Sequence, residues 1–177
     1  MNKRAHVIKV LAISTLGVAT LAGCTTDGGH PSNVKKINST GAQKTMTNSN
    51  LPAVTGSAGS APTIAAPHGS APSALETQDV IVGTGATALA TSTLTVHYTL
   101  MAWSTGKVVE SSWTSGQPAT FPLAQVIPGW QQGMPGMKEG GRRLLVIPPA
   151  LGYGAAGAGP IGPNETLIFV VDLVKVA

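Results

Sequence analysis

Side chains able to do covalent or metal chemistry are scarce in this 177-residue chain. It has four histidines and one cysteine, and no spacing of His, Cys, Asp or Glu matches a metal site. None of the glycine-rich segments has the form of a phosphate-binding loop that opens a helix. Ser111 and Ser112 stand together but have no plausible base beside them. We therefore expect no metal, no cofactor and no covalent intermediate.

The stretch from Phe121 to Trp130, FPLAQVIPGW, is suited instead to a binding site without reactive groups. Pro128 has the fixed φ of a first helical position, so the sequence predicts a short helix that begins there. Gly129 lets the backbone pass close to a neighbour, and Trp130 turns a large apolar ring inward. About six residues of helix before Gly133 cannot be stable alone, because helices shorter than roughly 12 residues are marginal in water. The helix must be held inside a sheet.

Strands that can form this sheet are predicted on both sides of the helix. The clearest covers residues 93–100, where apolar and polar side chains alternate strictly. Tyr98 falls on the inward face of this strand and His97 on the outward face, where we interpret it as a structural residue. Several strands and one short helix predict an α+β domain, with an antiparallel sheet packed against the helix. The further strands are expected at residues 80–82, 107–112, 142–147 and 166–176.

Residues 1–23 have the composition of an export signal. Basic residues open the segment, and the apolar run that follows is too short for a membrane-spanning helix of about 20 residues. The run closes on Leu-Ala-Gly-Cys, which resembles the lipobox of bacterial lipoproteins. That resemblance implies that Cys24 is lipidated after cleavage and anchors the exported chain to a membrane. Thr25 in place of aspartate implies the outer membrane, on its periplasmic side, if the cell is Gram-negative.

Residues 24–74 are predicted to be the lipidated cysteine and a flexible tether. Gly, Ser, Thr, Asn, Pro and Ala dominate there, without a sustained period of two or of 3.6. Residues 75–177 are the predicted folded domain and are enough for a single core. Basic and acidic residues nearly balance from Leu75 onward, so the pI of about 9.5 comes from the signal and the tether. This balance gives no basis for nucleic-acid binding.

A series of short motifs runs through residues 75–177. They are VHYT at 96–99, ESS at 110–112, FPL at 121–123, VIPGW at 126–130, GM at 136–137, LGYG at 151–154 and TLIF at 166–169. Each is weak alone, but together and in this order they resemble the FKBP-type peptidyl-prolyl isomerase family. The resemblance covers essentially the whole predicted domain. It implies a twisted antiparallel sheet wrapped around one short helix, in agreement with the strand pattern.

The resemblance also implies an apolar pocket that holds a proline ring. Trp130 is its expected floor, Tyr153 stands at its rim, and Glu110 replaces the family's more common aspartate near Tyr98. The residues expected to act catalytically are Tyr98, Glu110, Ile127, Trp130, Tyr153 and Phe169. Those expected to contact the substrate are Tyr98, Val109, Phe121, Val126, Ile127, Trp130, Tyr153, Ile161 and Phe169.

Three further positions depart from the family pattern. Val109 and Ala119 stand where an aromatic residue is common, and Leu100 replaces a usual glycine. These changes bear on affinity and substrate preference more than on the fold.

The activity implied by the resemblance is peptidyl-prolyl cis-trans isomerisation, as a folding helper of the cell envelope. A dry pocket favours the twisted, less polar transition state of an X-Pro bond, and the Ile127 N–H or the Tyr153 hydroxyl can hold a carbonyl. Expected ligands are proline-containing polypeptides and macrolide immunosuppressants of the family's type. We expect a monomer, because the sequence has no long helical arm like those that dimerise some relatives.

Two other functions stay open at this point. One is a non-catalytic FKBP-like module that binds proline-containing segments or a partner, its turnover lost with the changes at Val109, Glu110 and Ala119. The other is a purely structural lipoprotein, which would bind neither proline peptides nor macrolides. An assay of cis-to-trans isomerisation separates the enzyme from both.

Overall fold

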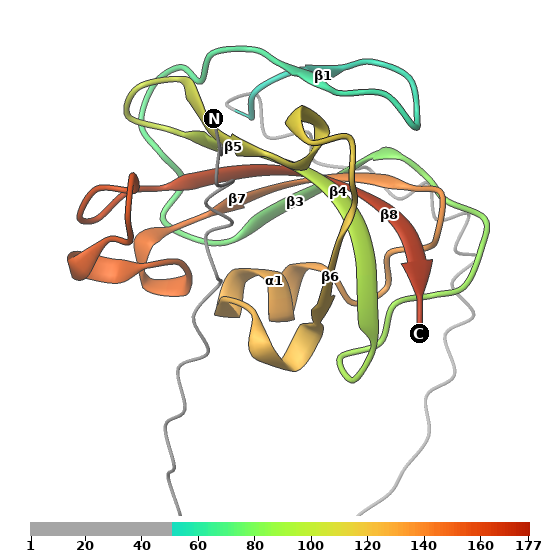
Figure 1. The fold of residues 1–177 in the computed structure, drawn as a ribbon. Coiled ribbons are helices and arrows are strands. Elements are labelled where there is room, and N and C mark those ends of the chain that lie inside the picture. Colours follow the sequence, from blue (N-terminus) through green and yellow to red (C-terminus); the bar gives the residue numbers. More distant parts are fainter. Residues whose placement is uncertain (1–50) are drawn as a thin grey trace, which may run out of the picture. The chain divides into compact units, whose positions relative to one another are not determined.

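The structure is a computed structural model that describes residues 51–177. The predicted signal peptide, Cys24 and the first part of the predicted tether lie outside the described residues. The main element is a six-stranded antiparallel sheet, in which five strands follow the order β3-β7-β8-β4-β5 (Figure 1). The sixth strand, β6, also pairs with β4: β6 binds the first half of β4 and β5 binds its second half. Its strands are β3 Glu76–Ile81, β4 Thr93–Ala102, β5 Lys107–Ser111, β6 Ala119–Pro122, β7 Arg142–Ile147 and β8 Leu167–Val176.

One short α-helix packs against the face of the sheet that we call the inner face. Helix α1 spans Pro128–Gly133, with Pro128 in its first turn, which confirms the helix predicted from the sequence. Gly129 allows the close packing, because a Cβ built there would lie 2.4 Å from Cγ2 of Ile147 on β7. At the other end, Arg143 donates a 2.8 Å hydrogen bond to the Gly133 carbonyl. The helix is therefore fastened to the sheet at both ends.

The inner face carries the larger of two buried apolar clusters. The alternation predicted for residues 93–100 is confirmed, since Leu94, Val96, Tyr98 and Leu100 of β4 all belong to this cluster. The apolar face predicted for the last strand also lies here, at Leu167, Phe169, Val171 and Leu173. Met134 and Met137, which follow the helix, also belong to this cluster. Trp130 of α1 is part of this inner cluster.

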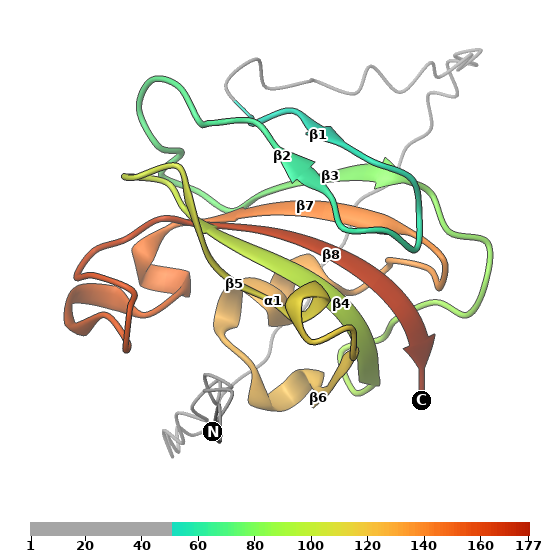
Figure 2. The same cartoon turned by 45° about the horizontal axis from the view of Figure 1, so that its top comes forward.

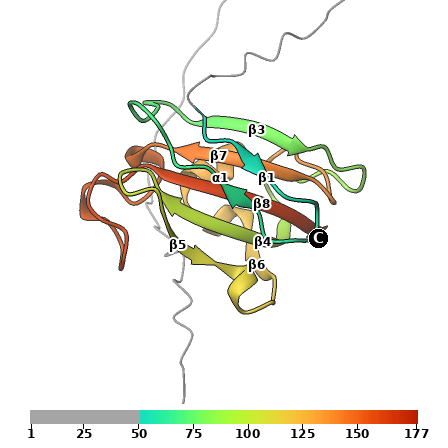
Figure 3. The same ribbon diagram turned by 90° about the horizontal axis from the view of Figure 1, so that it is seen from above.

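The outer face of the sheet is also apolar and is covered by residues that the sequence assigned to the tether. A small hairpin of β1 Val54–Thr55 and β2 Thr63–Ile64 lies across β7 and β8, on the side away from α1 (Figures 2 and 3). The predicted tether therefore does not reach residue 74 as free chain. The flexible-segment prediction is wrong for this part, because Val54 and Ile64 find apolar partners on the sheet.

Strand boundaries differ from the prediction at several ends: β3 begins at Glu76, β4 runs on to Ala102, β8 begins at Leu167, and β6 was not predicted. The strand expected at residues 80–82 is β3 and ends at Ile81 after a bulge, and Val82 is 75% exposed. The strand expected at 107–112 ends one residue earlier, where a 3-10 turn begins. The short 3-10 segments are Ser112–Thr114, Leu123–Gln125, Pro149–Leu151 and Gly154–Ala156. Among residues 51–177, no helix has the length and apolar character needed to cross a bilayer.

Candidate functional site

A pocket opens on the inner side of the sheet, between β4, α1 and the long loop before β8. The empty space that it encloses, part of which is open to solvent at the mouth, is about 360 Å³. Of the three tryptophans, two tyrosines and two phenylalanines in the chain, all but Trp103 and Trp113 line it. The lining residues are Tyr98, Leu100, Glu110, Phe121, Val126, Ile127, Trp130, Tyr153 and Phe169.

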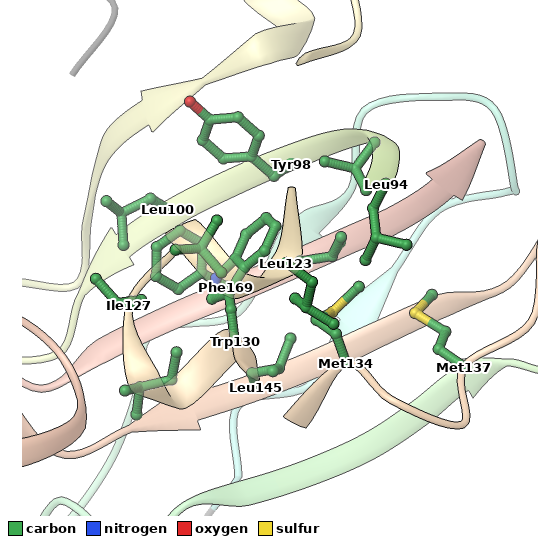
Figure 4. Packing of buried hydrophobic residues seen from close by; sticks show 14 of the residues in the cluster. Leu94, Tyr98, Leu100, Leu123, Ile127, Trp130, Met134, Met137, Leu145 and Phe169 are labelled. Carbon is green, nitrogen blue, oxygen red and sulfur yellow. The ribbon is translucent and has the colours of Figure 1, made fainter. Parts of the chain in front are cut away.

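Trp130 lies at the centre of the aromatic wall. Its ring meets Phe169 edge-on, with centroids 5.3 Å apart and planes at 86°, and Tyr98 and Phe121 approach it in the same manner at 6.1 and 6.0 Å. Figure 4 shows Trp130 beside Phe169, with the hydroxyl of Tyr98 pointing away from the core. Edge-to-face pairs of this kind are favourable beyond their buried area. The rings form a rigid apolar bowl with Trp130, only 4% exposed, at its base.

Two phenols and one carboxylate supply the polar groups of the bowl. The Tyr98 hydroxyl donates a 2.7 Å hydrogen bond to Oε1 of Glu110 on β5. Burial, and then the bond and charge of Glu110, raise the pKa of Tyr98 well above its usual value. Burial and the Glu110 charge also raise the pKa of Tyr153. Both phenols therefore stay protonated at neutral pH and can act as hydrogen-bond donors.

Two nitrogen donors of the bowl have no partner among residues 51–177. The buried indole nitrogen of Trp130 makes no hydrogen bond, and the N–H of Ile127 donates none. The Ile127 carbonyl is occupied, because it accepts from the N–H groups of Trp130 and Gln131 at the start of α1. The unused Ile127 N–H lies at a pocket-lining residue, where it can bind a carbonyl of a ligand.

A hydrogen bond to Ser112, which follows β5, fixes the backbone of Tyr98 on β4. The Ser112 hydroxyl accepts a 2.9 Å hydrogen bond from the Tyr98 N–H and lies 3.0 Å from Nδ1 of His97. The His97 ring stacks on Trp113 with centroids 3.9 Å apart. The expectation that Ser112 has no base beside it is therefore wrong, because the fold brings the imidazole of His97 next to its hydroxyl. His97 nevertheless has the structural place predicted for it, because it faces outward and Ser112 is bonded to the backbone of β4.

Most of the predicted site residues come together in the pocket. All six residues predicted to be catalytic line it, as do Phe121 and Val126. Val109 and Ile161 do not: Ile161 is 3% exposed within the inner cluster, and Val109 packs partly buried against the same cluster. Leu100 is the lining residue that was not included in the predicted site. Leu100 lies two residues from Tyr98 on the same face of the strand, and this spacing could have identified it as a lining residue.

The titratable side chains of the described residues are dispersed. Within residues 51–177, no group of three or more His, Cys, Asp or Glu side chains is placed to hold a metal ion. The pocket offers one carboxylate, and that group is engaged with Tyr98. What this arrangement can do is bind a small apolar ring, remove water from it and present hydrogen-bond donors at the edge.

The fold and the pocket define a class of ligand-binding α+β domain, and comparison with known proteins places it in a family. Residues 85–174 match the family model for FKBP-type peptidyl-prolyl cis-trans isomerase. A probable FK506-binding protein of Corynebacterium glutamicum is 47% identical over 114 residues, which are 64% of this chain and 97% of that protein. An FK506-binding protein of Streptomyces anulatus is 50% identical over 119 residues, 65% of this chain and 96% of the relative.

A solved structure agrees with these sequence relatives. The crystal structure of FkpA from Escherichia coli superimposes with a TM-score of 0.55 at 43% identity, over 58% of this chain and 47% of FkpA. The chain therefore belongs to the FKBP-type peptidyl-prolyl cis-trans isomerase family, and its fold is the FKBP-like α+β fold. It is accordingly a peptidyl-prolyl cis-trans isomerase, a folding helper that acts on X-Pro bonds.

Proposed function

We propose that the aromatic bowl around Trp130 is the isomerase site, and that it acts on X-Pro bonds of exported proteins beside a membrane. The observation that carries the first part is the closed wall of rings, with Tyr98, Phe121 and Phe169 all edge-on or tilted around Trp130. A proline ring is small, apolar and without an N–H, so it can enter such a bowl without losing a hydrogen bond.

The reaction needs no nucleophile. The X-Pro bond resists rotation because resonance gives it partial double-bond character, with a barrier of about 18–20 kcal/mol. At the twisted transition state that resonance is lost, so the carbonyl is less polar than in the planar ground state. Binding the bond in a dry apolar site removes water that stabilises the ground state more than the transition state.

The donors at the edge of the bowl position the substrate. We assign the Ile127 N–H to a carbonyl of the peptide, because this N–H has no partner within residues 51–177 and belongs to the pocket-lining residue that directly precedes α1. The Tyr153 hydroxyl, kept protonated by its raised pKa, is the second candidate donor. Trp130 and Phe169 contact the proline ring itself. Tyr98 and Glu110 fix one wall, since they bind one another across β4 and β5.

The proposed location rests on the N-terminal sequence. Residues 1–23 have the pattern of an export signal and end at a lipobox-like Cys24. A lipid-anchored isomerase would act on exported chains, with macrolides of the FK506 type as inhibitors, as the names of two relatives suggest. Cys24→Ser should release the protein from the membrane fraction while its isomerase rate stays unchanged. Retention of the variant on membranes would contradict the anchor.

A proteolysis-coupled assay of cis-to-trans isomerisation tests the assignment to this pocket. The proposal predicts catalysis of an Ala-Pro or Leu-Pro peptide and loss of that catalysis when a macrolide of the FK506 type is added. Peptide binding without acceleration would instead support the non-catalytic binding module. Acceleration that a bound macrolide does not reduce would place the activity outside the bowl.

A further inference from the structure

The outer face of the sheet is a second candidate binding surface, and it goes beyond the proposed isomerase site. Five alternate residues of β4, β7 and β8 form an apolar patch there, which we call the outer cluster. Each of them is no more than 4% exposed, although they point away from the pocket. The outer cluster consists of Met101, Leu144, Val146, Ile168 and Val170.

Much of the cover on this cluster comes from outside the matched family domain. Leu51, Val54 and Ile64 pack against the outer cluster together with Val80 and Trp103, and of these five only Trp103 lies within the family match at residues 85–174. Figure 3 shows the β1–β2 hairpin lying over β7 and β8. Two strands of two residues each are not stable alone in water. The hairpin therefore depends on the sheet, and the sheet depends on the hairpin to keep an apolar patch out of water.

A buried arginine makes the polar part of the contact. Arg142 is 0% exposed and forms a two-bond ion pair with Asp172, at 2.5 and 2.7 Å. Arg142 makes two further hydrogen bonds to the hairpin turn: Nη1 donates to the Gly56 carbonyl at 3.0 Å and Nη2 to the Ser60 carbonyl at 2.6 Å. Both acceptors are backbone atoms. Arg142 therefore recognises a carbonyl-presenting turn and not a particular side chain.

Side-chain packing and the two Arg142 hydrogen bonds attach the hairpin to the sheet. Within residues 51–177, no backbone hydrogen bond joins β1 or β2 to the six-stranded sheet. The hairpin is a separate two-stranded sheet. One side of the hairpin is apolar and half-buried, at the cross-strand pair Val54 and Ile64, while the opposite pair, Thr55 and Thr63, is exposed. Side-chain contacts and two bonds to carbonyls are the features of a docked peptide segment.

We propose that the outer face of the sheet is a peptide-binding surface, and that residues 51–66 are its occupant, docked in the same chain. The surface fits a short apolar β-hairpin whose turn presents two carbonyls to Arg142. The pocket is lined from the opposite face of the sheet, so the docked segment and the isomerase site lie on different faces. This proposal is independent of the catalytic assignment.

Hydrogen exchange of the full chain, followed by mass spectrometry, tests the docking. Residues 51–66 should exchange at least tenfold more slowly than the free peptide of that sequence, yet at least tenfold faster than the amides of β8, since docking opens before the sheet does. Exchange at the rate of the free peptide would show that the hairpin is not docked. Exchange together with β8 would show that it is an inseparable part of the core.

A matched pair of variants separates the docked side from the exposed side. Val54→Asp with Ile64→Asp should bring the exchange of residues 51–66 to the rate of the free peptide. Thr55→Asp with Thr63→Asp places two carboxylates opposite one another in the same way on the exposed side, so it controls for their mutual repulsion, and exchange should stay within about fivefold of wild type. Equal effects of the two pairs would overturn the proposal. The isomerase rate of each variant, measured separately, reports whether the pocket remains folded.

A synthetic peptide of residues 51–66 tests whether the face binds in trans. The labelled peptide should bind the Val54→Asp, Ile64→Asp chain at least tenfold more tightly than wild type, whose face is already occupied. The same peptide carrying both aspartates should not bind either chain. Equal affinity of the unmodified peptide for both chains, or no binding to either, would overturn the assignment of a binding surface.

Discussion

The Tyr98 hydroxyl and the Glu110 carboxylate form a 2.7 Å hydrogen bond that closes one wall of the pocket between β4 and β5. In this bond the phenol is the donor, and Glu110 needs only to accept. The pair is therefore a fixed part of the bowl, and desolvation of the X-Pro bond does not require it to exchange a proton.

Glu110→Gln tests whether Glu110 serves only as a hydrogen-bond acceptor for Tyr98. The amide oxygen of glutamine can accept the same bond without a charge, so the isomerase rate should fall by no more than about fivefold, from the weaker hydrogen bond. The rate should also stay flat between about pH 5 and 8 in both proteins. A steep pH profile in wild type that disappears in Glu110→Gln would instead make the carboxylate a direct participant.

The two tyrosines give the pocket its own titration signal, because both tyrosines of the chain line it. Burial and then Glu110 raise the pKa of Tyr98, and burial and Glu110 also raise that of Tyr153, relative to the ordinary value of 10. Tyrosinate absorbance of the folded protein should therefore rise only well above pH 10, and later than in denaturant. Tyr153→Phe isolates the signal of Tyr98. A folded-state midpoint near 10 for Tyr98 would contradict its burial against Glu110.

The same shifts predict how stability depends on pH. A pKa that is higher in the folded than in the unfolded state means that the folded state binds more protons above pH 10. The contribution is fully present below about pH 10 and is lost as the pH rises through the folded-state values. Denaturant midpoints should accordingly fall above pH 10, and the fall should be shallower in Tyr98→Phe.

Gly129 tests how closely α1 must approach the sheet. A Cβ at Gly129 would meet Cγ2 of Ile147 at 2.4 Å and its Cδ1 at 2.8 Å. Gly129→Ala should therefore destabilise the fold by about 1–3 kcal/mol, as overpacking does, and lower the isomerase rate by shifting Trp130. Ile147→Ala in the same chain should recover part of the rate. Gly162→Ala is the control, since nothing lies within 4 Å of its Cβ position; equal losses in the two alanine variants would refute the packing argument.

Much of the inner half of the molecule could be predicted from the sequence. Pro128 marks the start of a helix by its fixed φ, and strict alternation identified the inward face around Tyr98. Both signals come from neighbouring residues in the sequence, so they can be recognised without knowing the contacts made by the rest of the chain. Substrate contact by Val109 and Ile161 stays a prediction: both pack on the inner cluster outside the pocket lining, and the direction of a side chain at a strand edge or in a glycine-rich loop depends on distant contacts.

The outer half was missed for a different reason. Residues 51–66 have no period of their own, and their order comes from contacts with the sheet. The signal for a second covered face was nevertheless present in β7 and β8. Residues 144–147 and 167–171 are continuous apolar runs, which are typical of strands buried on both faces. A sheet with one solvent-exposed face would alternate in those strands.

The isomerase rate of Trp130→Leu is the most direct test of the central claim, that the aromatic bowl is the catalytic site. Trp103→Leu is the matched control, because Trp103 packs against the outer cluster on the opposite face of the sheet. Unfolding curves come first, since a large-to-small change in a core costs about 1–5 kcal/mol of stability. The account predicts that folded Trp130→Leu loses at least about tenfold in kcat/KM for an X-Pro peptide, equivalent to about 1.4 kcal/mol, while folded Trp103→Leu stays within about twofold. A folded Trp130→Leu protein with the wild-type kcat/KM would contradict it.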